Sequence, residues 1–290
     1  HGMCEYFQRY RGFAEFLCRN GIALVGNDHI GHGNSVTDRD MLGYFGEAGG
    51  YMYMVKDLHR MRAILEEILK NPVDGILIEG TKSAMPNPNF DLYEKLIGMG
   101  IPVVFFNGYY PTLSGTYSVC ADNQAGGAEL VRHLIDRGHT KIAGYFKSDD
   151  IQGHQRYSGF ISELFRSGLI IPDENVFWYT TETKEKLFDD PEEVLKRLGD
   201  NTAVVCYNDE VAFGLVKCLL SAGRRVPEDV AVVSFDNSNL SWISQVPITS
   251  LSYEDRNIGR IAAQKLVDIL DGRDVSSEVL PWTFIQKESS

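Results

Sequence analysis

The sequence predicts an α/β protein of two lobes, each built on a mostly parallel β-sheet with helices packed against it. From residue 73 onward, short apolar segments alternate with amphipathic ones, which is typical of consecutive strand–helix–strand units. Glycine follows most of the amphipathic segments, at the position where helices commonly end. The 290 residues are enough for one large or two ordinary domains.

The alternation assigns the elements in order along the chain. Strands are predicted over residues 73–79, 102–106, 141–146, 203–207, 230–235 and 283–286. Helices are predicted over residues 89–98, 126–137, 156–167, 191–198, 210–222 and 257–271. Left-handed C′ residues are expected at Gly100, Gly138, Gly168, Gly223 and Gly272.

The first 70 residues have a weaker pattern. A helix is predicted over residues 5–19, a strand over 22–27 and a second helix over 51–69. Residues 29–50 are rich in glycine and lack any periodicity, so we expect a long, irregular and mobile loop there.

Composition excludes several classes of protein. A net charge of −12 argues against a nucleic-acid surface on this chain, because phosphate binding needs clustered Lys and Arg. The five cysteines are odd in number and contain no CxxC pair, so we expect no disulfide framework, no metal site and no cofactor. A reducing, cytoplasmic location fits these thiols. No apolar run has the length of a membrane span and no signal segment is evident, so membrane insertion and secretion are not expected.

Polar side chains follow two of the predicted strands. Asn208 and Asp209 come directly after the strand 203–207, and Asp236 ends the strand 230–235. Ligands of open α/β sheets bind at this carboxyl edge. An amide both donates and accepts hydrogen bonds and a carboxylate accepts two, which suits the vicinal hydroxyls of a sugar. Asp209 also fits the N-cap of the next helix, so a purely local role for this pair stays open.

Two further features add to this edge. Residues 147–156 form a polar run between a strand and a helix, and Arg156 is expected to open that helix with its guanidinium near the same edge. Aromatic rings cover the apolar faces of sugars, and Tyr207 is a candidate for this role. Each residue also has an alternative role: Tyr207 could simply pack under a loop, and Arg156 could be a solvated charge in a loop.

Six ordered stretches carry a family resemblance: residues 73–84 (VDGILIEGTKSA), 122–127 (DNQAGG), 137–142 (RGHTKI), 146–153 (FKSDDIQG), 207–210 (YNDE) and 226–236 (VPEDVAVVSFD). On these, residues 73–290 resemble the effector-binding domain of the lactose/galactose repressor family, and within it the arabinose repressors, which add a winged-helix DNA-binding head. The resemblance implies a type I periplasmic-binding-protein-like fold that closes around a small sugar, such as the pentose L-arabinose, and performs no catalysis. It also implies a homodimer whose operator DNA is contacted only by a head absent from this chain.

The same resemblance assigns residues to the sugar. Arg156, Asn208 and Asp236 are implied as contacts from the second lobe. Glu79, Lys82 and Asn107 are implied as contacts from the first lobe.

Residues 1–66 resemble a different family, the α/β-hydrolases of the monoacylglycerol lipase or lysophospholipase type. The segment 1–3 (HGM) is similar to their oxyanion loop, and residues 27–35 (NDHIGHGNS) are similar to their DxRGHGxS loop. The nucleophile elbow GxSxG, which such a hydrolase needs, occurs nowhere in the sequence. We therefore expect no catalytic residues, and an inactive esterase fragment is the alternative function.

The two resemblances together predict the domain organisation. Residues 1–70 are expected to complete the first lobe, which then lacks its first strand, and residues 71–118 form the rest of that lobe. Residues 119–290 are expected to form the second lobe with the crossover segments and the C-terminal strand. A transport-associated sugar-binding protein is a further alternative on the same fold, although the unpaired cysteines and the absent signal segment count against export.

Overall fold

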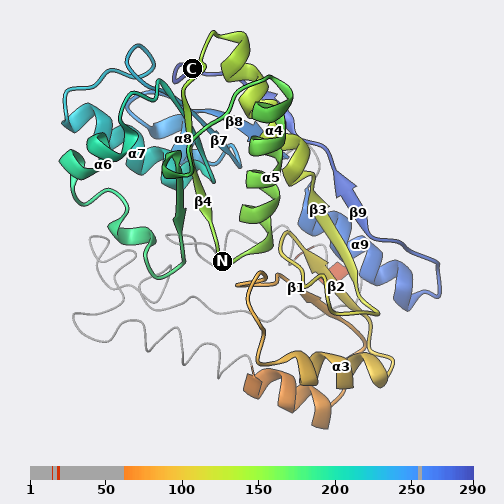
Figure 1. Ribbon diagram of the computed structural model, residues 1–290. Coiled ribbons are helices and arrows are strands. Elements are labelled where there is room, and N and C mark those ends of the chain that lie inside the picture. The colour runs from red at the N-terminus through yellow and green to blue at the C-terminus, as the bar shows by residue number, and fades with distance from the viewer. Residues whose placement is uncertain (1–14, 16–17, 20–61, 254–256) are drawn as a thin grey trace.

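Two β-sheets form the centres of two lobes in the computed structural model, which describes residues 15, 18–19, 62–253 and 257–290 (Figure 1). The first lobe lies at the lower right of the view and the second at the upper left. Each sheet has helices packed on both faces, as the strand–helix alternation of the sequence predicts.

The first sheet has the strand order β1-β2-β3-β9, and all its pairings are parallel. Its strands are β1 (Ile76–Ile78), β2 (Val103–Phe106), β3 (Tyr117–Ala121) and β9 (Glu278–Leu280). A helix over residues 62–70 and α3 (Phe90–Gly98) contribute to the core on one face, and α9 (Ile258–Leu270) packs on the other.

The second sheet has the strand order β10-β8-β7-β6-β4-β5, and β10 is antiparallel to β8. Its strands are β4 (Ile142–Lys147), β5 (Val176–Tyr179), β6 (Ala203–Cys206), β7 (Ala231–Phe235), β8 (Thr249–Ser252) and β10 (Thr283–Ile285). Its helices are α4 (Asn123–Asp136), α5 (Ile151–Arg166), α6 (Pro191–Leu198), α7 (Asp209–Ser221) and the short α8 (Asn239–Ile243). Two 3₁₀ turns, η4 (Asp173–Asn175) and η5 (Lys184–Lys186), lie in its loops.

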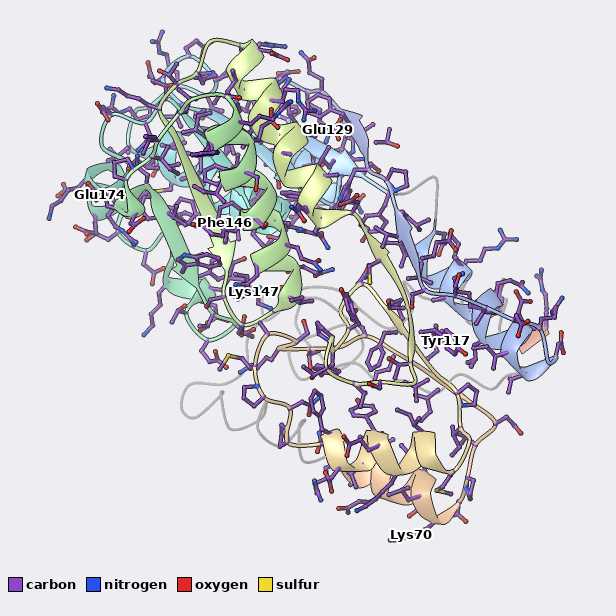
Figure 2. All side chains as sticks on the ribbon, turned by 45° about the vertical axis from the view of Figure 1, so that its right-hand side comes forward. Lys70, Tyr117, Glu129, Phe146, Lys147 and Glu174 are labelled. Carbon is purple, nitrogen blue, oxygen red and sulfur yellow. The ribbon has the colours of Figure 1, made fainter. Side chains whose placement is uncertain are left out.

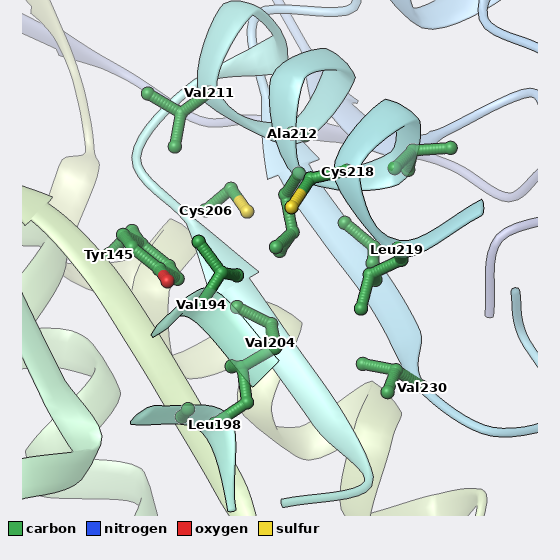
Figure 3. Packing of buried hydrophobic residues seen from close by; sticks show 14 of the residues in the cluster. Tyr145, Val194, Leu198, Val204, Cys206, Val211, Ala212, Cys218, Leu219 and Val230 are labelled. Atoms are coloured by element: carbon green, nitrogen blue, oxygen red, sulfur yellow. The ribbon is translucent and has the colours of Figure 1, made fainter. Parts of the chain in front are cut away.

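Strand β6 shows why the inner strands of this sheet can be predicted from the sequence. Because alternate residues of a strand point to opposite faces, a strand covered on both sides is apolar throughout. Val204 and Cys206 join the core formed with α6 and α7, where Leu219 packs beside them (Figure 3). Ala203 and Val205 face the opposite core, formed with α4 and α5.

The chain passes between the lobes from β3 to α4 at residues 121–123, from β8 to α9, and from β9 to β10 at residues 280–283. The first and third of these connections contact each other directly. The backbone N–H of Asp122 donates to the carbonyl of Leu280 over 2.8 Å, and Trp282 Nε1 donates to the carbonyl of Asp122 over 3.0 Å. The segments therefore form a joint between the lobes rather than independent linkers.

The predicted elements from residue 73 onward are confirmed, with shifted ends. All five predicted C′ glycines have positive φ, between 73° and 89°. Four strands were not predicted: β3, β5, β8 and β9. Each has only three to five residues, and strands such as TSLS in β8 are too polar to stand out before their sheet neighbours are known.

One predicted boundary is wrong in a way that matters for the site. The helix expected to open at Arg156 begins at Ile151, so Arg156 lies in its second turn. The physical reason is the N-cap: the Asp150 carboxylate accepts the backbone N–H of Gly153 over 3.0 Å, which starts the helix five residues earlier.

Several predictions fall outside the described residues: the strand 22–27, the loop 29–50, most of the helices 5–19 and 51–69, and the consequences of a missing first strand. Within the described range, residues 62–70 are helical, and β1 is the outer strand of the first sheet. The boundary expected between residues 118 and 119 falls within β3. None of the helices described is both long and apolar enough to cross a membrane.

Candidate functional site

Arg156 is the centre of a polar cluster at the carboxyl edge of the second sheet. Its side chain is only 3% exposed. A buried guanidinium needs hydrogen-bond acceptors to offset the loss of water. Nε donates to Asn123 Oδ1 over 2.9 Å, one terminal nitrogen donates to the carbonyl of Tyr207, and the other donates to Asp236 Oδ1 over 3.3 Å. The acceptors come from α4, from the end of β6 and from the end of β7, so three elements fix this one side chain.

Aromatic rings enclose the same guanidinium. Its central carbon lies 4.3 Å from the ring centre of Phe235, 4.7 Å from that of Tyr207 and 5.5 Å from that of Trp282. Burial disfavours the charged form, but Asp236 and its other acidic neighbours outweigh burial and raise the pKa of Arg156. Tyr207, the aromatic candidate from the sequence, lies at this edge together with Phe235, whereas Trp282 was not predicted because it lies far away in sequence, between β9 and β10.

Asp236 is the part of the cluster that reaches solvent. It follows the last residue of β7 with a φ of 93°, and its side chain is 30% exposed while one oxygen contacts Arg156. A carboxylate at this partly exposed position can accept a hydrogen bond from a ligand hydroxyl. The predicted proximity of Arg156 and Asp236, which are 80 residues apart, is therefore present in the structure.

The N-cap role for which the sequence suggested Asp209 belongs to Asn208. Asn208 is the N-cap of α7, and its Oδ1 accepts the backbone N–H of Val211 over 3.1 Å. Asp209 is 2% exposed and binds instead to Ser250 Oγ over 2.7 Å and to the backbone N–H of Ser238 over 2.5 Å. Burial, and then the nearby charge of Asp236, raise the pKa of Asp209 to about 6. Asn208 directly follows Tyr207, so it stays next to the Arg156 cluster.

A second polar group lies beside the first. The hydroxyl of Tyr207 donates to Asp150 Oδ2 over 2.8 Å, and Lys147 Nζ donates to the same oxygen over 2.9 Å. Burial opposes the charge of Lys147, but Asp150 and Asp149 outweigh it and raise the pKa of the ammonium group. Figure 2 shows Lys147 at the end of β4 that faces the first lobe. In the sequence, the polar run 147–156 indicates this group. The spacing of its residues does not show that Asp150 is a helix cap and not a ligand contact.

Two predicted residues of the first lobe, Glu79 and Asn107, contact each other. The Asn107 side chain hydrogen-bonds Glu79, which directly follows β1. Desolvation by the surrounding protein raises the pKa of Glu79, Asp150 raises it further, and Lys147 acts in the opposite direction. Glu79 therefore lies within electrostatic range of Asp150 and Lys147 of the second lobe.

Lys82, the remaining predicted residue, contacts the other lobe at a different place. Its ammonium pairs with Glu182, which follows β5, and both side chains are well exposed. Beside it, Ser83 Oγ accepts the backbone N–H of Ile151 over 2.9 Å. The structure therefore places Lys82 in a contact between the lobes with the loop after β5, and not in the Arg156 cluster.

A chain of amide contacts also joins the lobes. Tyr109 of the first lobe receives a hydrogen bond of 3.4 Å from Gln155 Nε2, and Gln155 Oε1 accepts from Asn123 Nδ2 over 3.0 Å. Asn123 in turn accepts from Arg156. The cluster thus offers fixed donors, acceptors and rings to a small polyhydroxylated molecule. In the described ranges no group of three or more His, Cys, Asp or Glu side chains is arranged to hold a metal ion.

Comparison with protein families gives two matches. A family model described as a periplasmic binding protein-like domain matches residues 131–290, which is more than half of the chain. A model described as serine aminopeptidase, S33, matches residues 1–73, in agreement with the hydrolase resemblance of the first 66 residues.

Curated relatives match the longer part. The arabinose metabolism transcriptional repressor of Halalkalibacterium halodurans is 37% identical over 209 residues, and that of Geobacillus stearothermophilus is 36% identical over 222 residues. These alignments cover 71% and 76% of this chain, but only 56% and 61% of the two relatives. This chain therefore spans less than two thirds of their length.

Solved structures agree on the fold. A transcriptional regulator CelR–cellobiose complex has a TM-score of 0.76 at 25% identity, covering 99% of this chain and 80% of its own. The transcription regulator CcpA of Lactococcus lactis has a TM-score of 0.72 at 23% identity, covering 97% and 92%. With the two-sheet architecture, the crossovers and the family match together, the chain belongs to the family of periplasmic binding protein-like domains.

Proposed function

We propose that this chain is the sugar-sensing effector domain of a bacterial transcriptional repressor that resembles the arabinose repressors. A small sugar, such as the pentose L-arabinose, binds between the two lobes and controls DNA binding through a homodimer. A separate DNA-binding segment contacts the operator, because a net charge of −12 is unfavourable for contact with phosphates. Transcriptional regulators of this kind work in the cytoplasm, which also suits free thiols.

The observation that carries the proposal is the Arg156 cluster. A buried guanidinium held by three acceptors and enclosed by aromatic rings, with the carboxylate of Asp236 30% exposed beside it, is a preorganised recognition site for hydroxyl groups. A pentose is favoured because the two curated relatives quoted above are named as repressors of arabinose metabolism.

The charge distribution suggests how sugar binding affects the lobes. Glu79 of the first lobe, which hydrogen-bonds Asn107, lies within electrostatic range of Lys147 and Asp150 of the second. A sugar whose hydroxyls bind to both sets stabilises the closed arrangement by its differential affinity for it. The joint at residues 121–123 and 280–283 permits this closure, and in a dimer closure alters the spacing of the attached DNA-binding segments.

Catalysis is not part of the proposal. The match of residues 1–73 to serine aminopeptidases favours a hydrolase as the second candidate. It lacks the GxSxG elbow that positions a nucleophile between strand and helix. Those residues serve the first lobe in our proposal, as a helix–strand–helix segment that precedes residue 71.

Calorimetric titration of the full chain with a panel of aldopentoses and hexoses, including L-arabinose, tests the proposal. We expect saturable binding of one pentose, a rise in melting temperature with that sugar and a dimer in sedimentation. The same preparation is incubated with p-nitrophenyl butyrate. Ester turnover that a serine-reactive inhibitor abolishes, together with no binding across the panel, would favour the hydrolase instead.

A further inference from the structure

The turn that presents Asp236 has an unusual backbone. Asp236 and Asn237 are consecutive non-glycine residues with φ values of 93° and 45°. Left-handed backbone is disfavoured for residues with a Cβ atom, and two in succession persist only where neighbouring groups hold them. The position of the Asp236 carboxylate therefore depends on the contacts of the turn 236–238.

Those contacts converge on one buried carboxylate. Ser250 Oγ accepts the backbone N–H of Asn237 over 3.0 Å and donates its own proton to Asp209 Oδ1 over 2.7 Å. Asp209 Oδ2 accepts the backbone N–H of Ser238 over 2.5 Å. On the other side of the turn, Lys287 Nζ donates to Asn237 Oδ1 over 2.7 Å.

Asp209 is not needed to start its own helix. Asn208 provides the side-chain cap of α7, and Asp209 is buried behind it at 2% exposure. Burial of a carboxylate next to a second one is electrostatically unfavourable. The hydrogen bonds that partly offset this cost lead to the turn of Asp236, to Ser250 in β8 and to Ser234 in β7.

We propose that Asp209 is a positioning residue for ligand recognition: through Ser250 and Ser238 it holds the turn 236–238 so that Asp236 meets both Arg156 and the ligand. The inference rests on the proposed function for the ligand, but its structural half concerns only this chain. Asp209 is 2% exposed, so it reaches the ligand through the groups that it holds and not by direct contact.

Protonation of Asp209 weakens this arrangement. The Asp209 carboxylate accepts hydrogen bonds from the hydroxyl of Ser250 and from the backbone N–H of Ser238. When the carboxyl is protonated, its own O–H points at one of these two groups, and that hydrogen bond is lost. The groups that face it are the carboxylate of Asp236 from the end of β7 and the thiol of Cys206 from β6. Burial followed by Asp236 raises the pKa of Asp209 to about 6, so the neutral form is reached in mildly acidic solution.

The test compares Asp209→Asn and Ser250→Ala with Asp190→Asn in the full chain. Asp190 is a matched control because it is an exposed carboxylate that caps α6 through the backbone N–H groups of Glu192 and Glu193. L-arabinose and the rest of the sugar panel are titrated by calorimetry between pH 5 and 8, and melting curves are recorded without sugar.

We expect Asp209→Asn and Ser250→Ala to weaken sugar binding about tenfold or more at pH 7.5, since a charge-assisted anchor is lost. Asp190→Asn retains the wild-type affinity. The affinity of the wild type falls as the pH is lowered through 6, and this decrease is absent in Asp209→Asn. The inference is overturned if both Asp209→Asn and Ser250→Ala bind the sugar with wild-type affinity and a wild-type pH profile. If Asp209→Asn does not fold, the result for Ser250→Ala alone decides the test.

A crystal structure of Ser250→Ala separates this inference from the proposed function. If the wild type binds no sugar of the panel, the proposed function fails, but the turn can still be inspected. We expect residues 236 and 237 to leave the left-handed region and Asp236 to move away from Arg156. An unchanged turn in that structure overturns the positioning role.

Discussion

Replacement of Asp236 by Ala tests the site most directly, because it separates ligand recognition from the packing of Arg156. A carboxylate that accepts hydroxyl groups contributes about 1.5–3 kcal/mol to binding. This predicts a loss of roughly ten- to hundredfold in affinity for the sugar. Asp236→Asn keeps the shape of the side chain and one acceptor, so its loss is expected at the lower end of that range.

The structure also sets the cost to the fold. Removing one partner of a buried ion pair costs about 3–5 kcal/mol, whereas an exposed pair contributes about 0–1 kcal/mol. Asp236 is 30% exposed, and Arg156 keeps its hydrogen bonds to Asn123 and to the carbonyl of Tyr207. We therefore expect a loss of about 1–2 kcal/mol in unfolding free energy, or roughly 2–8 °C in melting temperature.

The assay is a sugar titration by calorimetry and a ligand-free melting curve on the same preparation of each variant. An affinity loss that far exceeds the loss of stability supports Asp236 as a binding group. An unchanged isotherm removes Asp236 from the site. A large drop in melting temperature with little change in affinity shows that the residue acts on the fold through Arg156.

Three more predictions follow from the structure. Lys82→Ala should change sugar affinity by less than about fivefold in calorimetry, because an exposed ion pair contributes about 0–1 kcal/mol. A loss of about a hundredfold would show instead that Lys82 contacts the ligand. Gly159→Ala should lower the unfolding free energy by about 1–3 kcal/mol in urea, since the new Cβ would lie 1.9 Å from the carbonyl oxygen of Gln124 in α4. Gly98→Ala is the control: its Cβ would have nothing within 4 Å, so this variant should be neutral or stabilising. Equal effects of the two substitutions would refute this account of the α4–α5 packing. The pKa of Asp209 is raised from 3.8 to about 6, so its ionised carboxylate holds the turn at a cost to the stability of the whole fold. The unfolding free energy should be highest below pH 3.8 and should fall by on the order of 3 kcal/mol as the pH rises through 6. Urea unfolding of Asp209→Asn should lack this fall, and a variant with the wild-type pH profile would contradict the assignment.

Much of this protein follows from local pattern. The apolar strands β2, β4, β6 and β7, the periodic helices between them and the C′ glycines are encoded within short windows, because covered parallel strands are apolar throughout and left-handed helix ends favour glycine. The carboxyl edge of the sheet, and with it Asn208 and Asp236, follows from the same pattern.

The partners of these residues were decided by the tertiary structure. That Trp282 encloses Arg156, that Lys147 and Asp150 form a second polar group, and that Lys82 turns to Glu182 all depend on how separate elements meet. The same is true of the short strands, such as β8, whose polar residues become a strand through pairing with β7.

The division of roles between Asn208 and Asp209 shows the physical reason for this limit. Both residues suit a helix N-cap and a ligand contact by chemistry alone, so the sequence determines that a polar pair ends β6 and opens α7. Burial of Asp209 against Ser250 and the turn 236–238 then assigns the cap to Asn208 and the buried carboxylate to Asp209. Spacing along the chain fixes which residues reach the edge of a sheet, but their hydrogen-bond partners and their pKa values depend on desolvation and on charges brought in from distant segments.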